Sequence, residues 1–215
     1  MANLEPLIQS IPVAPLKLAS LEGCRTLADQ VNNYLVSFRH ESPTNVGQAD
    51  TLQGYCADSY LLECECPRFG SGEGKGVLKE SVRGCDLFIM ADVTNHSLTY
   101  RLNGYENHMS PDNHYQDLKR IISAADGKAR RINVIMPFLY EGRQHKRSKR
   151  ESLDCALMLQ ELVAMGVSNI LTFDAHDPRV SNSIPLHGFD SFMPTYQFLK
   201  ALVNSVPDFV IDNDH

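Results

Sequence analysis

The stretch Arg131-Ile-Asn-Val-Ile-Met-Pro-Phe-Leu-Tyr-Glu-Gly-Arg-Gln-His-Lys-Arg147 decides the fold expected for this chain. It opens with a short apolar run that ends at Met136, and Pro137 then stops any ladder or helix, because proline has no N–H and a fixed φ. A glycine-bearing, strongly cationic loop follows. A buried strand that ends in such a loop is typical of open α/β proteins, which bind ligands at the carboxyl edge of a parallel sheet.

A second stretch, Asn169-Ile-Leu-Thr-Phe-Asp-Ala-His-Asp177, has the same form: a short apolar run that delivers Asp174 and His176 at its end. One helix-length segment separates the two runs, so we expect the two strands to lie side by side. From residue 86 to 173 the predicted order is strand, helix, strand, helix, strand. Right-handed crossovers then give an α/β fold, a parallel sheet flanked by helices.

The individual elements follow from apolar periodicity and from turn residues. One helix start is well marked, because Ser110-Pro111-Asp112 offers a cap, a proline at the first position and an acid near the positive end of the helix dipole. Predicted strands are 16–19, 60–66, 77–79, 86–90, 132–136 and 169–173; predicted helices are 27–38, 110–127, 152–165 and 194–203; predicted loops are 41–54, a mobile glycine-rich 67–76, and an irregular 174–194.

Composition describes an ordinary globular chain. It has 215 residues, 43% of them apolar and 21% charged, and a net charge of −6 that argues against a nucleic-acid partner. No apolar run is long enough to span a membrane, and no secretory signal opens the chain. The six cysteines form no CxxC pair, which favours packed, reduced thiols in a cytoplasm over a structural zinc site.

Three successive predicted strands end in polar groups. Asp92 follows the first, Arg143 and Gln144 follow the second, and Asp174 and His176 follow the third. In a parallel sheet these three ends share one edge. Carboxylates and an imidazole suit a divalent cation that also takes phosphate oxygens, and arginine suits the phosphates themselves. The edge therefore predicts a site for a metal–polyphosphate ligand.

Each feature also has a simpler interpretation. The run from Arg143 to Arg150 holds five Lys or Arg in eight residues and is most often a solvated loop. Asp174-x-His176 can be a turn that hydrogen-bonds its own backbone, as Asp often does after a strand. Ser81-Val-Arg-Gly84 is most often just a turn. The glycine-rich loop is not a P-loop, because Gly76 follows Lys75 where that motif needs Ser or Thr.

From about residue 16 to 203, the chain resembles the N-terminal half of ribose-phosphate pyrophosphokinase, also called phosphoribosyl pyrophosphate synthetase. Four landmarks in order carry the resemblance: Arg68-Phe-Gly-Ser-Gly-Glu73, Glu80-Ser-Val-Arg-Gly-Cys-Asp86, Pro137 with Gly-Arg-Gln144, and Thr172-Phe-Asp-Ala-His176. The resemblance implies a phosphoribosyltransferase-like domain. It also implies the Mg²⁺-dependent reaction of ATP with ribose 5-phosphate, which yields phosphoribosyl pyrophosphate and AMP, in dimers or hexamers.

By resemblance, Arg143 and Gln144 match the family's ATP-binding Arg-Gln. His176 matches a Mg²⁺-linked histidine, with Asp174 beside it as part of the ATP site. The fit is physically sound, because diphosphoryl transfer needs positioning and charge neutralisation more than covalent help.

Two further sets of residues are implied by resemblance alone. Phe69, Ser71 and Glu73 match positions that reach the adenine of a neighbouring subunit. Ser81 and Arg83 match part of the phosphate-type regulatory site of some members.

The chain departs from the family pattern at several places. His145 stands where Asp commonly follows the Arg-Gln pair, the run from Asp177 to Val180 diverges, and insertions occur near residues 100–113. The family's second domain, with its acidic ribose-phosphate loop and its catalytic flap, has no counterpart here. We therefore expect one domain at residues 1–205 and the start of a linker at 206–215.

Three functions remain open at this stage. The first is the ATP-side half of the enzyme, which would supply no catalytic residue itself and be inactive alone. The second is a non-catalytic regulatory subunit of the same fold, which His145 and the divergence after His176 keep open. The third is an RNA-binding module that uses the cations of residues 143–150, whose sign would be a steep salt dependence.

Overall fold

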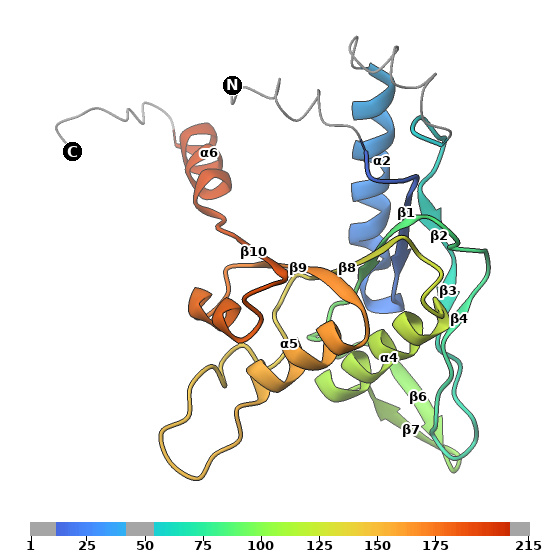
Figure 1. The fold of residues 1–215 in the computed structure, drawn as a ribbon, viewed down its shortest axis with the longest axis vertical. Coiled ribbons are helices and arrows are strands. Elements are labelled where there is room, and N and C mark those ends of the chain that lie inside the picture. The colour runs from blue at the N-terminus through green and yellow to red at the C-terminus, as the bar shows by residue number, and fades with distance from the viewer. Residues whose placement is uncertain (1–11, 42–53, 207–215) are drawn as a thin grey trace, which may run out of the picture.

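A computed structural model describes residues 12–41 and 54–206 of the chain, and Figure 1 shows their arrangement. The main sheet has six strands in the order β10-β9-β8-β5-β1-β2, and every neighbouring pair in it is parallel. Its strands are β1 (Leu16–Ser20), β2 (Leu61–Leu62), β5 (Asp86–Met90), β8 (Arg131–Met136), β9 (Val167–Phe173) and β10 (Gly188–Phe192). The predicted parallel α/β architecture is confirmed.

Helices cover both faces of the sheet. Helices α4 (Pro111–Ala124) and α5 (Asp154–Ala164) bury their apolar sides in one large core against β5, β8 and β9. Helix α2 (Arg25–Glu41) packs through Ala28 against Leu18 and Met90 in a second cluster. Strand residues alternate between these two clusters, as the two-residue period of a strand requires. Figure 1 shows α4 and α5 together and α2 well apart from them.

Local signals place the helix ends as expected. The hydroxyl of Ser110 accepts a hydrogen bond from Asn113 N at 3.2 Å, and Pro111 is the first residue of α4. Glycines with positive φ follow both central helices, at Gly127 after α4 and at Gly166 after α5. The turns after these helices lead directly into β8 and β9, so the helix ends help to set where those strands begin.

The strand predicted at 60–66 is divided between two sheets. Its first part pairs with β1 as β2, whereas β3 (Cys64–Glu65) pairs antiparallel with β4 (Val77–Leu78) in a separate two-stranded sheet. A third sheet, the hairpin β6 (Thr99–Leu102) and β7 (Tyr105–His108), lies in the region where the sequence showed only insertions.

The stretch 174–194, predicted to be irregular, contains regular structure. A 3₁₀ helix η3 (Pro178–Ser183) is followed by β10, which extends the sheet beside β9. The prediction was wrong because β10 is a half-exposed edge strand with the sequence GFDSF, whose polar residues and glycine hide the apolar pattern of a strand.

A buried polar row locks the register of β5, β8 and β9 at their amino ends. Asn133 donates to Asp86 Oδ1 at 2.7 Å and accepts from Asn169 Nδ2 at 2.6 Å, and Arg131 Nε donates to the same Asp86 oxygen at 2.9 Å. Asn133 and Asp86 are both buried, so these bonds satisfy groups that would otherwise be costly. This register determines which residues stand at the carboxyl ends of β5, β8 and β9.

The last helix, α6 (Thr195–Ser205), lies apart from the rest and buries no residue. It confirms the helix predicted at 194–203. The predicted linker falls almost wholly on residues 207–215, outside the described part of the chain, and so does most of the loop predicted at 41–54. The domain boundary at 205 stays a prediction. Within the described residues, no helix is long and apolar enough to cross a bilayer, and all six cysteines are free thiols.

Candidate functional site

The carboxyl ends of β5, β8 and β9 meet at one cavity of about 530 Å³. Arg143 comes from the loop after β8, and Asp174 and His176 come from the loop after β9. Three predicted residues from two strand ends therefore share one crevice, whereas Asp92, predicted at the end of β5, does not line it. The complete lining is Thr94, Phe138, Leu139, Gly142, Arg143, Phe173, Asp174, Ala175 and His176.

Asp174 leaves β9 in the left-handed backbone region, with φ of 46°. Asp is one of the few non-glycine residues that adopt this region readily, because its short polar side chain can hydrogen-bond locally. The turn is fastened to β10, because Asp174 N donates to Phe192 O at 3.0 Å and Ala175 N donates to Ser191 Oγ at 2.9 Å. Strand β10 thus holds the segment that carries His176.

The loop after β8 is built in the same way. Glu141 has φ of 54°, and Gly142 N donates to Leu139 O at 3.0 Å. A Cβ at Gly142 would lie only 3.0 Å from that same oxygen, so the tight turn favours glycine. The exposed side chain of Arg143 follows at once and reaches the cavity.

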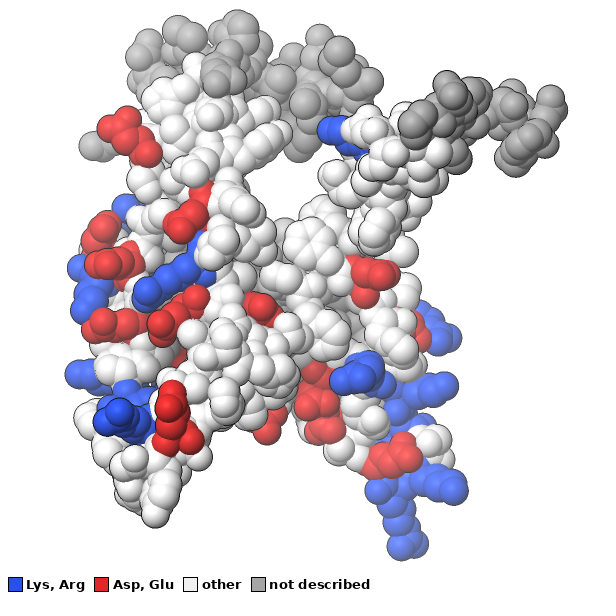
Figure 2. Space-filling model, turned by 180° about the vertical axis from the view of Figure 1, so that it is seen from behind, with Lys and Arg blue, Asp and Glu red and all other residues white. Residues whose placement is uncertain are grey.

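Gln144, expected beside Arg143 in the ATP site, does not line the cavity. Its side-chain Nε2 donates to Ser152 O at 2.7 Å and to Lys146 O at 3.3 Å. These bonds close the base of the cationic loop. Figure 2 shows that loop as a projecting group of lysines and arginines, and all of its cationic residues are exposed: Arg143, Lys146, Arg147, Lys149 and Arg150.

His145 lies between the two loops. Its ring centroid is 5.2 Å from that of His176, with the planes tilted by 54°, and its Nε2 is 3.4 Å from Asp177 Oδ2. Arg179 donates hydrogen bonds to Asp177 from its backbone N and its guanidinium, and these bonds hold the pKa of Asp177 well below its usual range. Asp177 also caps η3 by accepting from Arg179 N.

The described residues contain no group of three His, Cys, Asp or Glu side chains able to hold a metal ion by themselves. His176 and Asp174 supply one imidazole and one carboxylate at the cavity. Any cation held there would complete its coordination with ligand oxygens or water, which is the way Mg²⁺ binds beside phosphates.

Phe69, Ser71 and Glu73 lie on the turn between β3 and β4. Figure 1 shows this turn beside the hairpin β6–β7, at the opposite side of the molecule from the loop after β8. The segment predicted to be a mobile loop is a hydrogen-bonded turn, in which Phe69 N donates to Glu73 O at 2.7 Å and Ser71 Oγ donates to Glu73 Oε2 at 2.8 Å. The exposed Phe69 ring projects from a hydrogen-bonded frame.

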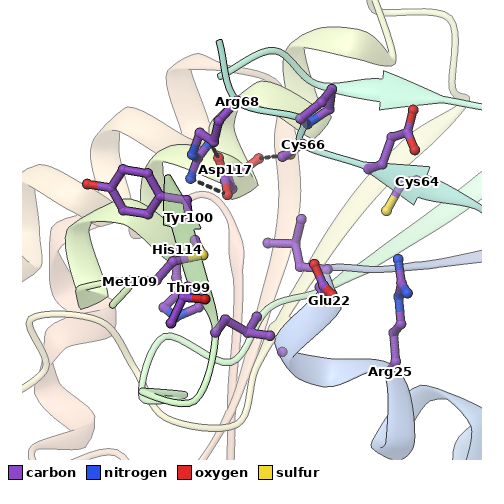
Figure 3. Close-up of a pocket in the computed structure, with 15 residues that line it drawn as sticks. Glu22, Arg25, Cys64, Cys66, Arg68, Thr99, Tyr100, Met109, His114 and Asp117 are labelled. Carbon is purple, nitrogen blue, oxygen red and sulfur yellow. Dashed lines mark hydrogen bonds and ion pairs between the residues drawn. The ribbon is translucent and has the colours of Figure 1, made fainter. Parts of the chain in front are cut away.

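A buried ion pair anchors this turn to α4. Figure 3 shows the side chain of Arg68 pointing at Asp117. Its two terminal guanidinium nitrogens donate to the two carboxylate oxygens at 2.6 and 2.8 Å. Arg68 also lies over the ring of Tyr100 in β6, 5.5 Å from its centroid. Arg120 donates to Asp117 as well, at 2.6 Å. Arg68, Tyr100 and Asp117 border a second cavity of about 250 Å³.

Ser81 and Arg83 lie in the turn that precedes β5, at the amino edge of the sheet and therefore opposite the first cavity. Both residues are exposed, and Arg83 N donates to Ser81 Oγ at 3.3 Å. Gly84 continues the turn with φ of 71° and donates to Lys128 O at 3.0 Å. The two residues predicted to be regulatory are thus separate from Arg143 and His176.

Comparison with known proteins decides the family. Residues 16–166 match the model of the N-terminal domain of ribose phosphate pyrophosphokinase. The chain belongs to this family.

Ribose-phosphate pyrophosphokinases of Corynebacterium ammoniagenes and Bacillus cereus are each 28% identical to it over 167 residues, which is 77% of this chain and 41% of each relative. The crystal structure of phosphoribosylpyrophosphate synthetase from Mycobacterium smegmatis superposes with a TM-score of 0.64 at 20% identity, over 88% of this chain and 52% of that one. The match confirms the predicted phosphoribosyltransferase-like fold. The chain spans about half or less of the length of these proteins.

Within this pyrophosphokinase domain, the family match includes Arg143 but ends before Asp174 and His176. Their place in the site rests on the geometry described above. Sequence reasoning missed Phe138 and Phe173, two partly exposed aromatic residues that line the cavity. A signal was available, because Phe173 is the last residue of a predicted strand and Phe138 follows another by two residues, next to a polar loop.

Proposed function

We propose that this chain is the N-terminal, ATP- and Mg²⁺-binding half of a ribose-phosphate pyrophosphokinase. In the complete protein, the C1 hydroxyl of ribose 5-phosphate would attack the β-phosphorus of ATP, and the diphosphoryl group would move to the sugar with release of AMP. One observation carries the proposal: Arg143, Asp174 and His176, which follow two different strands, line a single cavity. Membership of the family supports it.

In this function Arg143 binds and orients the phosphates, since a guanidinium presents several donors in a fixed plane. His176 and Asp174 hold Mg²⁺, which fits a site with fewer than three protein ligands, because Mg²⁺ keeps waters and takes substrate phosphate oxygens. When bound, the cation neutralises charge on the transferring group. Gln144 acts on the ATP site indirectly, because its side chain closes the loop that carries Arg143.

The other predicted residues fit an assembly. Phe69, Ser71 and Glu73 would reach the adenine bound to a neighbouring copy, which agrees with the place of the β3–β4 turn on the opposite side of the molecule from the loop after β8 (Figure 1). This role requires dimers or hexamers. Ser81 and Arg83 would bind a phosphate-type regulator at the opposite edge of the sheet. Six free thiols agree with a reducing, cytoplasmic location.

The test is isothermal titration of the chain with ATP, in the presence and absence of Mg²⁺. His176→Ala should lose the Mg²⁺-dependent part of the affinity, and Arg143→Ala should weaken ATP with or without the cation. Lys149→Ala is the matched control, since it removes one cation from the exposed part of the same loop and should change ATP affinity only slightly. Unchanged Mg²⁺-ATP affinity in His176→Ala would refute the metal role.

A non-catalytic regulatory subunit of the same fold is the second candidate. It is favoured by His145, which lies beside His176 at a position where an acid is expected from the resemblance. AMP release separates the two: the chain combined with the carboxyl-terminal half of a relative should form AMP only when ribose 5-phosphate is added. Nucleotide binding without sugar-dependent AMP would favour the regulatory subunit.

A further inference from the structure

His145 and Asp177 face each other across the two loops of the site. The side chains are 13% and 11% exposed, and their closest polar atoms, His145 Nε2 and Asp177 Oδ2, are 3.4 Å apart. The ring of His176 lies tilted against the ring of His145, with the two ring centroids 5.2 Å apart. The imidazole of His145 is thus enclosed by the segment that carries the cavity histidine.

Each member of the pair is held on its own loop. His145 Nδ1 lies 3.2 Å from Arg143 O, so the ring is tied to the backbone of the residue that reaches the cavity. Asp177 accepts from Arg179 N at 2.9 Å and from the Arg179 guanidinium at 2.6 Å. A contact between two such anchored groups joins the loop after β8 to the loop after β9.

We propose that His145 and Asp177 are a coupled pair of positioning residues that fixes Arg143 and His176 relative to one another, an inference that rests on the proposed Mg²⁺-ATP site. The two residues of the pair are far apart in the sequence and meet in the structure. The pair therefore joins the two loops that carry Arg143 and His176.

The chemistry of the pair predicts that the effects of substitutions at the two positions on Mg²⁺-ATP binding do not add. His145→Asp would place a second carboxylate on the loop that faces Asp177, and two nearby like charges repel. Asp177→Asn keeps an oxygen that can accept from His145 and from Arg179 N. In the double variant His145→Asp/Asp177→Asn, the new amide can donate to the new carboxylate, so a complementary pair is restored.

The experiment is a double-mutant cycle on the 215-residue chain, read out as the dissociation constant for Mg²⁺-ATP. His145→Asp should weaken binding roughly tenfold or more, the size of effect typical of groups that orient a metal ligand. Asp177→Asn should change it little, and the double variant should regain most of the loss. The control Lys146→Gln removes one positive charge from the neighbouring, exposed position and should leave the affinity nearly unchanged.

A second measurement needs no nucleotide. NMR relaxation of the His176 imidazole, assigned by its disappearance in His176→Ala, should show greater side-chain mobility in His145→Asp and recovery in the double variant. If the chain binds no Mg²⁺-ATP, the proposed function is refuted. The mobility of the His176 side chain would still show whether His145 and Asp177 act as a coupled pair. Equal affinity and mobility in His145→Asp and the unmodified chain, or a double variant as impaired as His145→Asp, would overturn the inference.

Discussion

Removing Asp117 should destabilise the fold more than removing its ion-pair partner Arg68. Arg68 is 10% exposed and Asp117 8%, so removing one partner leaves a poorly hydrated charge. Arg68→Ala leaves Asp117 with Arg120, whereas Asp117→Ala leaves two guanidinium groups without their carboxylate. Breaking a buried pair costs about 3–5 kcal/mol. We expect Arg68→Ala at the lower end of that range and Asp117→Ala at the upper end.

The assay is urea unfolding followed by circular dichroism, because the chain has no tryptophan to report by fluorescence. Lys79→Ala is the control, since its pair with Glu65 is exposed at 44% and 46% and should contribute at most about 1 kcal/mol. Limited trypsin digestion should also cut faster at Lys75 in Arg68→Ala, because the turn loses its anchor on α4. The reasoning would be refuted if Arg68→Ala lowered the free energy of unfolding more than Asp117→Ala did. It would also be refuted if both substitutions lowered it by less than about 1 kcal/mol.

Three further predictions concern the sheet and the thiols. Asn133→Ala should lower the free energy of unfolding by about 2–3 kcal/mol, because the buried Asp86 and the partly buried Asn169 each lose a hydrogen bond; an unchanged urea midpoint would contradict this. Gly188→Ala should lower the melting temperature, since a Cβ would collide with Asn169 Oδ1, while Gly70→Ala, with open space around it, should not. Burial raises the pKa of the Cys64 thiol from 9.0 to about 11, so the unfolded chain loses this proton first as pH rises. The free energy of unfolding should therefore fall between pH 9 and 11, and less steeply in Cys64→Ala. The same direction holds for Cys24, Cys66 and Cys155.

The central part of the fold was predictable because its strands are short apolar runs between well-marked helices. The hairpin β6–β7 was missed although the sequence carried its signal. Asn103 and Gly104 have φ of 50° and 85°, and Asn-Gly is the preferred pair for a hairpin turn with two positive φ values. Strand β10 had no comparable signal, because its pairing with β9 depends on tertiary contacts that a half-polar edge strand does not reveal.

The candidate site was predictable only in outline. Strand order placed Arg143, Asp174 and His176 on one edge, and the structure brings them to one cavity. It was not predictable that Gln144 turns its amide to the backbone of its own loop, nor that His145 meets Asp177. The first depends on how the loop after β8 closes on itself and the second on how the two loops fold against each other, and spacing along a chain carries no information about either.

The most direct test of the central claim is an amide chemical-shift map of the ¹⁵N-labelled chain on addition of ATP with Mg²⁺. The account predicts that shifts concentrate at Thr94, Gly142 and Arg143 and at the turn from Asp174 to His176, and that those in the turn require the cation. Shifts confined to the exposed cations of residues 146–150, or no Mg²⁺-dependent shift near His176, would contradict it.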